Sequence, residues 1–125
     1  MVSFSGLEFN KRDAVYEQIA MHVKRQIMLG MANSGDILPS RRELAAITSI
    51  NPNTAQKAYK LMEDEGYVRT GGNTASTLYV DDAIKTRIED ELCRGAVESF
   101  VHEARQNNLS YKKVIGLISE IWGED

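Results

Sequence analysis

The first third of the chain carries a helical pattern of apolar residues. Five of them follow one another at intervals of three and four positions: Val15, Ile19, Ala20, Val23 and Ile27. This spacing is typical of a helix with one buried face. We expect the helix to run from about residue 13 to residue 29, with Asp13 capping its start and Gly30 its end. The turn-forming stretch 32–36 follows it.

Two shorter helices are predicted in the middle of the chain. Ser40 and Glu43 have the S-x-x-E spacing of a capping box, in which each side chain accepts a backbone N–H of the other residue. Asn51 and Pro52 then suit the cap and the first position of a second helix. That second helix has two rows at the same spacing, an apolar one and a polar one: Ala55, Ala58, Tyr59 and Met62, and Asn53, Gln56, Lys57 and Lys60.

A small hairpin follows the second short helix. Gly66 is placed to end that helix, and residues 67–70 and 77–80 are two β-prone runs around a six-residue tip. A short helix, a turn, a helix with a polar exposed face and a two-stranded ribbon occur in this order in a winged helix-turn-helix, whose second helix enters the major groove of DNA. We therefore expect an α+β fold, with a winged helix-turn-helix DNA-binding domain over residues 1–80.

The pattern from residue 81 to residue 125 predicts two further helices. The first has a row of Ile84, Ile88, Leu92, Ala96, Phe100 and Ala104, widened by Cys93, Val97 and Val101. After a break at residues 107–110, the second has Tyr111, Val114, Ile115, Ile118, Ile121 and Trp122. A helical hairpin of this length cannot bury such faces by itself. We expect residues 81–125 to form a homodimer contact. A rival use is a small effector pocket formed by Phe100, Tyr111 and Trp122.

Composition adds bounds to this picture. The chain has 125 residues, of which 42% are hydrophobic and 26% charged, as in a small globular protein. A lone Cys93 excludes an internal disulfide and a multi-cysteine zinc site, and we expect it to be a small buried hydrophobe. No apolar run approaches the roughly 20 residues that cross a bilayer, so we expect a cytoplasmic protein without a membrane partner.

The net charge of −3 is unevenly distributed. Residues 11–80 hold nine Lys and Arg against seven Asp and Glu, whereas residues 81–125 hold six against ten. Residues 41–60 carry four cations against the single Glu43. The local charge thus favours a nucleic-acid surface in the predicted winged domain, although the whole chain is acidic.

Four ordered blocks resemble the GntR family of bacterial transcription regulators. They are residues 15–19 (VYEQI), 38–45 (LPSRRELA), 51–59 (NPNTAQKAY) and 65–67 (EGY). The Asn-Pro-Asn-Thr start of the second short helix and the short C-terminal region resemble the YtrA-type subfamily in particular. The resemblance implies a homodimeric repressor on an operator with two-fold related half-sites about one helical turn apart, and a transporter operon as the regulated unit.

The resemblance also implies roles for individual residues. Arg42 matches the family arginine that reaches a guanine, whose paired acceptors suit a guanidinium. Ser40 caps the helix close to a phosphate. Contact positions on the recognition helix fall on Asn53, Thr54 and Gln56, and Gln56 would favour adenine. Phosphate contacts fall on Arg41, Lys57 and Lys60, for which a solvated charged face is the alternative, and Tyr59 is expected in the core.

The predicted wing departs from the family pattern Gly-x-Gly-Thr-Phe-Val. Residues 73–80 read NTASTLYV, and Gly71 and Gly72 come earlier, near the tip. These two glycines allow the hairpin to turn and are its candidate DNA-binding positions. Whether such a wing contacts the minor groove is open.

Enzymatic chemistry has no support in the sequence. His22 and His102 are far apart, and HExxH, GxSxG and phosphate-binding glycine motifs are absent. We therefore expect a regulator, with no catalytic residue, metal or cofactor. One alternative is a winged-helix protein-interaction module that does not bind DNA. An RNA-binding protein is a second alternative, which has less support because no aromatic residues alternate with the cations on the exposed face.

Overall fold

The computed structural model describes residues 1–72 and 75–124. The chain divides into two compact units, Met1–Glu89 and Asp90–Asp125. The first unit therefore extends past residue 80, where the sequence predicts the domain boundary. The extension is the start of α4 (Asp82–Gln106), where Ile88 is buried and Arg87 donates to the backbone oxygen of Glu65.

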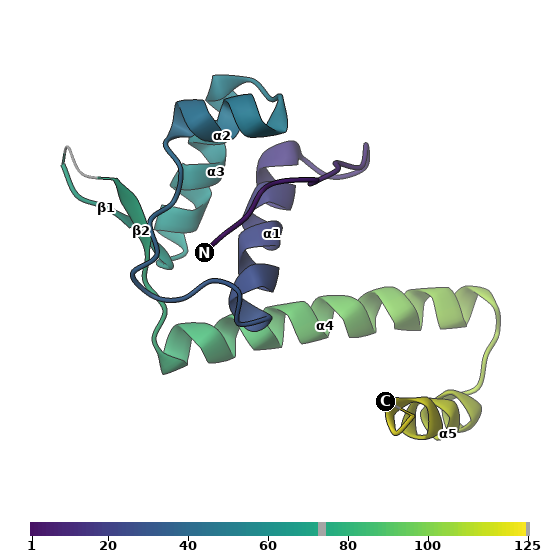
Figure 1. Ribbon diagram of the computed structural model, residues 1–125. Helices are drawn as coiled ribbons and strands as arrows, with labels where there is room; N and C mark the ends of the chain where they lie inside the picture. The colour runs from purple at the N-terminus through teal and green to yellow at the C-terminus, as the bar shows by residue number, and fades with distance from the viewer. Residues whose placement is uncertain (73–74, 125) are drawn as a thin grey trace. The chain divides into compact units, whose positions relative to one another are not determined.

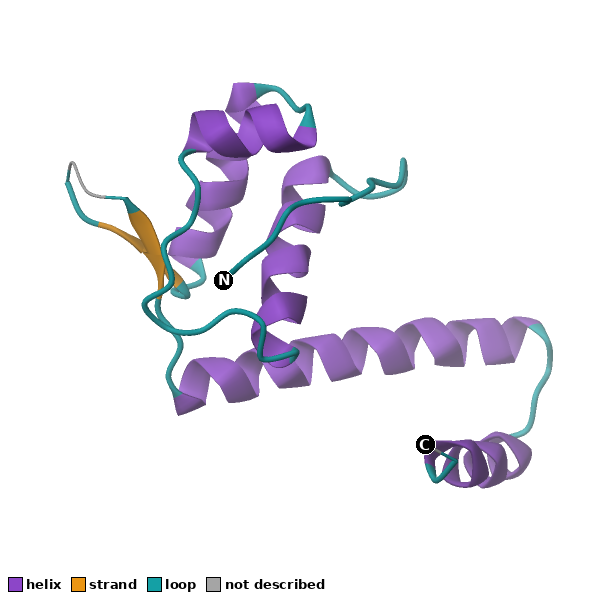
Figure 2. Ribbon diagram, in the orientation of Figure 1, coloured by secondary structure: helices purple, strands orange, loops and turns teal. Residues whose placement is uncertain are grey.

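The first unit is an α+β winged helix-turn-helix, as predicted (Figure 1). Its elements are α1 (Val15–Met28), α2 (Arg41–Thr48), α3 (Pro52–Asp64), β1 (Val68–Thr70) and β2 (Ser76–Leu78). The helix α3 packs against both α1 and α2. The two strands are antiparallel and pair Val68 with Leu78 and Thr70 with Ser76, which makes the small ribbon drawn in orange in Figure 2.

The core forms where the three helices meet the ribbon. Its largest fully buried side chains are Tyr59, Tyr67, Ile19, Leu38, Leu44, Met62, Leu78, Ile88 and Val23. The predicted apolar row of α3, Ala55, Ala58, Tyr59 and Met62, is entirely buried. Burying a large apolar side chain contributes about 2 kcal/mol, so this row fixes which face of α3 points to solvent.

The predicted N-terminal caps of α2 and α3 are confirmed. The Oγ of Ser40 accepts the N–H of Glu43 at 3.1 Å, and the carboxylate of Glu43 accepts the N–H of Ser40 at 3.0 Å. The hydrogen bond from the N–H of Ser40, together with the nearby Ser40 hydroxyl, lowers the pKa of the Glu43 carboxyl below its ordinary value. The Oδ1 of Asn51 accepts the N–H of Asn53 at 2.8 Å, and Pro52 opens α3.

The predicted cap of α1 is wrong at its start and right at its end. The capping position is Ala14, with no side-chain hydrogen bond, and Asp13 lies one residue too early. The Asp13 carboxylate instead accepts the Asn10 amide at 3.3 Å. Gly30 follows the helix with φ of +75°, and Gly66 follows α3 with φ of +89°, a conformation that glycine adopts at little cost.

The strands differ by one or two residues from the predicted runs at 67–70 and 77–80. Tyr67 is a fully buried core residue just before β1. Ser76 belongs to β2 because it pairs with Thr70 of β1, and its carbonyl also accepts the N–H of Leu38 at 2.9 Å. The chain leaves the ribbon after Leu78, and the N–H of Val80 binds the Oγ of Ser34. Asn73 and Thr74 of the predicted wing lie outside the described residues.

The two predicted C-terminal helices are present as α4 and α5 (Tyr111–Trp122), the latter capped by Ser110. Over the described residues, most of the apolar side chains on these two helices are exposed or only partly buried. Ile88 is the buried residue of α4, and α5 has none. Cys93 is exposed, so its predicted burial is wrong for the single chain. Helical periodicity identifies an apolar face, but it does not tell whether the same chain supplies the surface that covers it.

The capping box of α2 generates a stability prediction. Ser40→Ala removes the acceptor for the N–H of Glu43 and should lower the free energy of unfolding by about 1 kcal/mol. Ser40→Asp, which keeps an acceptor, should unfold like the wild type in the same urea titration. Equal losses in both variants would contradict a capping role for Ser40.

Candidate DNA-binding surface

The exposed face of α3 carries the predicted polar row. Asn53, Gln56, Lys57 and Lys60 are all exposed, and Thr54 is partly so. Amide groups pair with base edges in the major groove, whereas ammonium groups pair with phosphates. This helix therefore presents side chains of both kinds along one solvent face.

Arg42 extends this surface from the start of α2. Its side chain is exposed, and within the described residues no hydrogen bond or ion pair holds it. The neighbouring Ser40 is also exposed, but its hydroxyl is used in the helix cap. Arg42 is therefore available to a bidentate acceptor such as the guanine edge or a phosphate.

The three side chains predicted to contact phosphates differ in how strongly they are paired with other residues of the protein. Lys57 is exposed and, within the described residues, is not paired. Lys60 lies 2.7 Å from Asp64, and this hydrogen bond raises the pKa of the lysine. Arg41 is held more firmly, because its Nη2 lies 2.8 Å from the Oε1 of Glu63 and its guanidinium sits 4.7 Å from the centre of the Tyr59 ring.

Tyr59 is a core residue, as predicted. Its side chain is fully buried, and its hydroxyl donates to the carbonyl oxygen of Pro39, next to the cap of α2. Burial raises the pKa of the Tyr59 hydroxyl far above its ordinary value, although the Arg41 guanidinium acts in the opposite direction. The hydroxyl therefore ties α3 to the start of α2.

The wing adds one cation, Arg69, to the residues predicted from the sequence. Arg69 in β1 is exposed, and its guanidinium lies 3.4 Å from the centre of the Tyr79 ring. Gly71 and Gly72 are exposed at the described edge of the tip, with φ of +50° at Gly72. The sequence signal that could have identified this arginine is its place directly after an apolar valine in a β-prone run.

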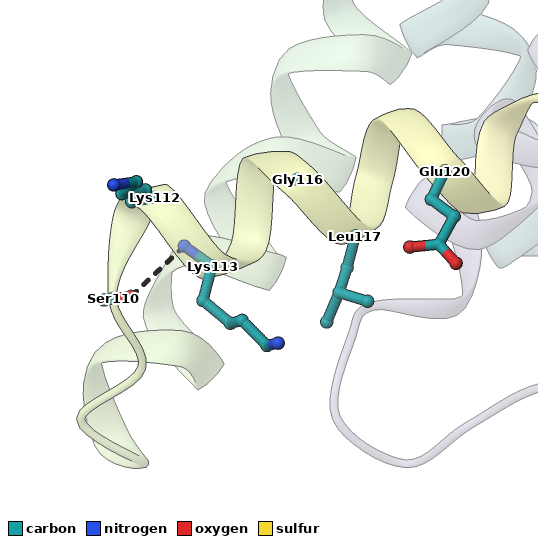
Figure 3. Close-up of a pocket in the computed structure, with 6 residues that line it drawn as sticks. All are labelled: Ser110, Lys112, Lys113, Gly116, Leu117 and Glu120. Atoms are coloured by element: carbon teal, nitrogen blue, oxygen red, sulfur yellow. Dashed lines mark hydrogen bonds between the residues drawn. The ribbon is translucent and has the colours of Figure 1, made fainter.

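The second unit offers weak support for an effector site. Tyr111 and Trp122 are 79% and 84% exposed, so with Phe100 they do not enclose a ligand in the single chain. A hollow on α5 is lined by Ser110, Lys112, Lys113, Gly116, Leu117 and Glu120 (Figure 3). All of these residues are exposed, and Ser110 uses its Oγ to cap α5. This hollow is an open helix surface.

Residues 1–72 and 75–124 contain neither a cluster of metal ligands nor a membrane-spanning helix. No group of three or more His, Cys, Asp or Glu side chains is placed to hold a metal ion there. Over the same residues, no helix has the length and apolar character that crossing a bilayer requires.

Comparison with known proteins identifies the family. The model for bacterial regulatory proteins of the gntR family matches residues 15–76, which include α1, α2, α3 and the start of the wing. The chain is 33% identical over 110 residues to the HTH-type transcriptional repressor YtrA of Bacillus subtilis (strain 168), an alignment that spans 86% of this chain and 83% of YtrA. The protein belongs to the GntR family, as the sequence motifs predicted.

Two further relatives agree with this assignment. The uncharacterized HTH-type transcriptional regulator YhcF of the same bacterium is 31% identical over 108 residues, which are 86% of this chain and 89% of YhcF. A GntR family transcriptional regulator from Listeria monocytogenes has a TM-score of 0.78 and 28% identity, and the match covers 90% of this chain and 98% of that one. These relatives are named as regulators and not as enzymes, as predicted for this chain.

The position of Tyr59 generates a second prediction. Tyr59→Phe removes the hydroxyl donor from the part-buried hydrogen bond to the carbonyl of Pro39 and should lower the free energy of unfolding by about 1 to 2 kcal/mol. Tyr16→Phe is the matched control, because the Tyr16 side chain is partly exposed and its hydroxyl has no partner in the described part of the chain. Thermal unfolding of both variants measures the difference. Equal stability would contradict the proposed tie between α3 and α2.

Proposed function

We propose that the protein is a homodimeric transcriptional repressor that binds an inverted-repeat operator, and that this operator controls a transporter operon, as the resemblance to YtrA-type regulators implies. The observation that carries the proposal is the joint exposure of the polar row of α3 and of Arg42. The repressor YtrA, with which the chain shares 33% identity, supports the same direction of regulation.

In this proposal α3 enters the major groove. Arg42 pairs with a guanine, and Asn53, Thr54 and Gln56 contact base edges, with Gln56 favouring adenine. Lys57 contacts a phosphate, and the backbone at Ser40 approaches another at the start of α2. Lys60 reaches a phosphate only by leaving Asp64, an exposed pairing that costs little to break. Gly71 and Gly72 bring the wing close to the DNA backbone.

Dimerisation through residues 81–125 follows from the uncovered apolar faces. Val97, Phe100 and Val101 of α4 are 53%, 42% and 37% exposed. On α5, Ile115, Leu117, Ile118 and Ile121 are between 41% and 60% exposed. Contiguous apolar faces of this kind mark protein interfaces. A second copy of the same chain is the partner that a two-fold symmetric operator requires. A small effector, if one exists, would then bind at a site completed by the dimer.

Operator binding tests the DNA-reading residues. A duplex that the wild-type protein selects from a randomised DNA library serves as the operator, and affinity is measured by fluorescence anisotropy at several salt concentrations. Arg42→Ala should lose about 1 to 3 kcal/mol of operator affinity and relax the preference at one base position. Lys57→Ala should weaken binding to all sequences and reduce the salt slope by about one.

Lys85→Ala is the control for these variants, because Lys85 is an exposed lysine at the start of α4. Its affinity should equal that of the wild type. If the library yields no enriched duplex, and binding to a protein partner proves insensitive to salt, the chain is a protein-interaction module. Enrichment from an RNA library alone would favour the RNA-binding alternative.

The oligomeric state tests the dimer contact. Phe100→Glu places a carboxylate on the apolar face of α4 and should convert the dimer to a monomer in sedimentation velocity. Operator affinity should fall about a hundredfold, because the second half-site no longer binds intramolecularly. His102→Glu adds the same carboxylate at an exposed position of α4 that lies on the side opposite to Phe100 by helical spacing, and it should remain dimeric. A monomeric wild-type protein would contradict this contact.

A further inference from the structure

The carboxylate of Glu63 lies between the start of α2 and the base of the wing. Its Oε1 accepts from the Nη2 of Arg41 at 2.8 Å and from the Oγ1 of Thr70 at 2.9 Å. The hydroxyls of Thr70 and Ser76 lie 2.5 Å apart, so the chain of contacts continues from β1 into β2. Glu63 thus joins α2, α3 and the two strands of the ribbon.

The side chain of Arg41 is directed into the protein. It is 32% exposed, and Glu63 is 29% exposed. The guanidinium stacks over the ring of Tyr59, and its Nε is buried without a hydrogen-bond partner. A buried donor without a partner has a cost, so the packing against Tyr59 and the pairing with Glu63 outweigh the loss of water at Nε. The adjacent Arg42 has neither contact and is exposed.

We propose that Glu63 is a positioning residue of the DNA-binding surface, which holds Arg41 against α3 and leaves Arg42 as the arginine of α2 that reaches DNA. This inference rests on the proposed DNA binding. It removes Arg41 from the phosphate contacts that the sequence predicts and gives it a role inside the protein.

Glu63 retains Arg41 when DNA is bound because release has two costs. The half-buried carboxylate would lose its charged partner, and it would then stand unpaired beside a polyanion. The ion pair is also already formed in the free protein, so it needs no ordering of a new partner. A phosphate would therefore have to bind Arg41 more strongly than Glu63 and the Tyr59 ring together do.

The consequence is a higher ratio of specific to non-specific affinity. Each additional phosphate contact strengthens binding to every sequence, whereas a base contact strengthens binding to one. By keeping one of two adjacent arginines out of the phosphate contacts, Glu63 lowers the sequence-independent part of the affinity. It also fixes the first turn of α2, from which Arg42 projects.

The salt dependence of binding to a mixed-sequence DNA duplex tests this role, because counterion release counts phosphate contacts. Glu63→Gln keeps an acceptor for Thr70 but removes the charge that holds Arg41. The double variant Arg41→Gln/Glu63→Gln has the net charge of the wild type and lacks both members of the pair. Lys57→Gln serves as the reference for the loss of one phosphate contact. Thermal unfolding establishes that each variant is folded at the assay temperature.

Four results are expected. Between about 50 and 200 mM salt, the affinity of Glu63→Gln should fall about threefold more per protomer than that of the wild type, since Arg41 then reaches a phosphate. The affinity of the double variant should fall by the same factor as that of the wild type. The affinity of Lys57→Gln should fall about threefold less per protomer than that of the wild type. The ratio of operator to mixed-sequence affinity should decrease in Glu63→Gln.

Two results would overturn the inference while leaving the proposed function intact. The first is a double variant with the reduced salt dependence of Lys57→Gln, because Arg41 would then already contact DNA in the wild type. The second is a Glu63→Gln variant with unchanged salt dependence, because Glu63 would then not be what holds Arg41. Absence of DNA binding by the wild-type protein would overturn the proposed function and this inference with it.

Discussion

The arrangement of the first unit depends on the burial of one face of α3. Ala55, Ala58, Tyr59 and Met62 are all fully buried, so the rotation of this helix about its axis is fixed. Since a helix turns by 3.6 residues, fixing the apolar row also fixes the direction of every polar side chain on the opposite face. Tyr59 adds a second constraint, because its hydroxyl bonds the carbonyl of Pro39 just before the cap of α2. The direction of Arg42 thus follows from the packing of α3.

The same packing explains why the cations of this surface are not equivalent. Arg41 lies over Tyr59 and beside Glu63, Lys60 pairs with Asp64 on the surface, and Arg69 stacks on Tyr79. Arg42 and Lys57 are exposed and, over the described residues, unpaired. The local charge of residues 41–60 therefore overstates the number of cations that are ready to meet a phosphate. A count of charges gives the sign of a surface, and the pairing within the protein gives its effective strength.

The sequence predicted features that depend on nearby residues or on a long periodic pattern. The capping box of Ser40 and Glu43, the caps of α3 and the two faces of α3 belong to this group. The Asp13 cap failed by one residue, because a hydrogen bond to Asn10 was an equally local alternative. The partnership of Arg41 with Glu63 could not be predicted, since the two residues are 22 positions apart and meet only after α2 packs on α3. The predicted burial of Cys93 is wrong because a periodic pattern identifies an apolar helix face but does not show which surface, if any, packs against it.

For the proposed repressor, the small number of available cations would make dimerisation a requirement for tight operator binding. With few phosphate contacts per protomer, the sequence-independent affinity of one winged domain would be modest. Linking two such domains raises the affinity without adding any contact to the single protomer, because the second half-site is then bound intramolecularly. The exposed apolar faces of α4 and α5 have the chemistry to supply this link. In the proposed dimer, anything that alters the association of these helices between the two copies would change operator occupancy by far more than it changes the affinity of one domain, so the C-terminal region is where regulation of such a repressor would act most effectively.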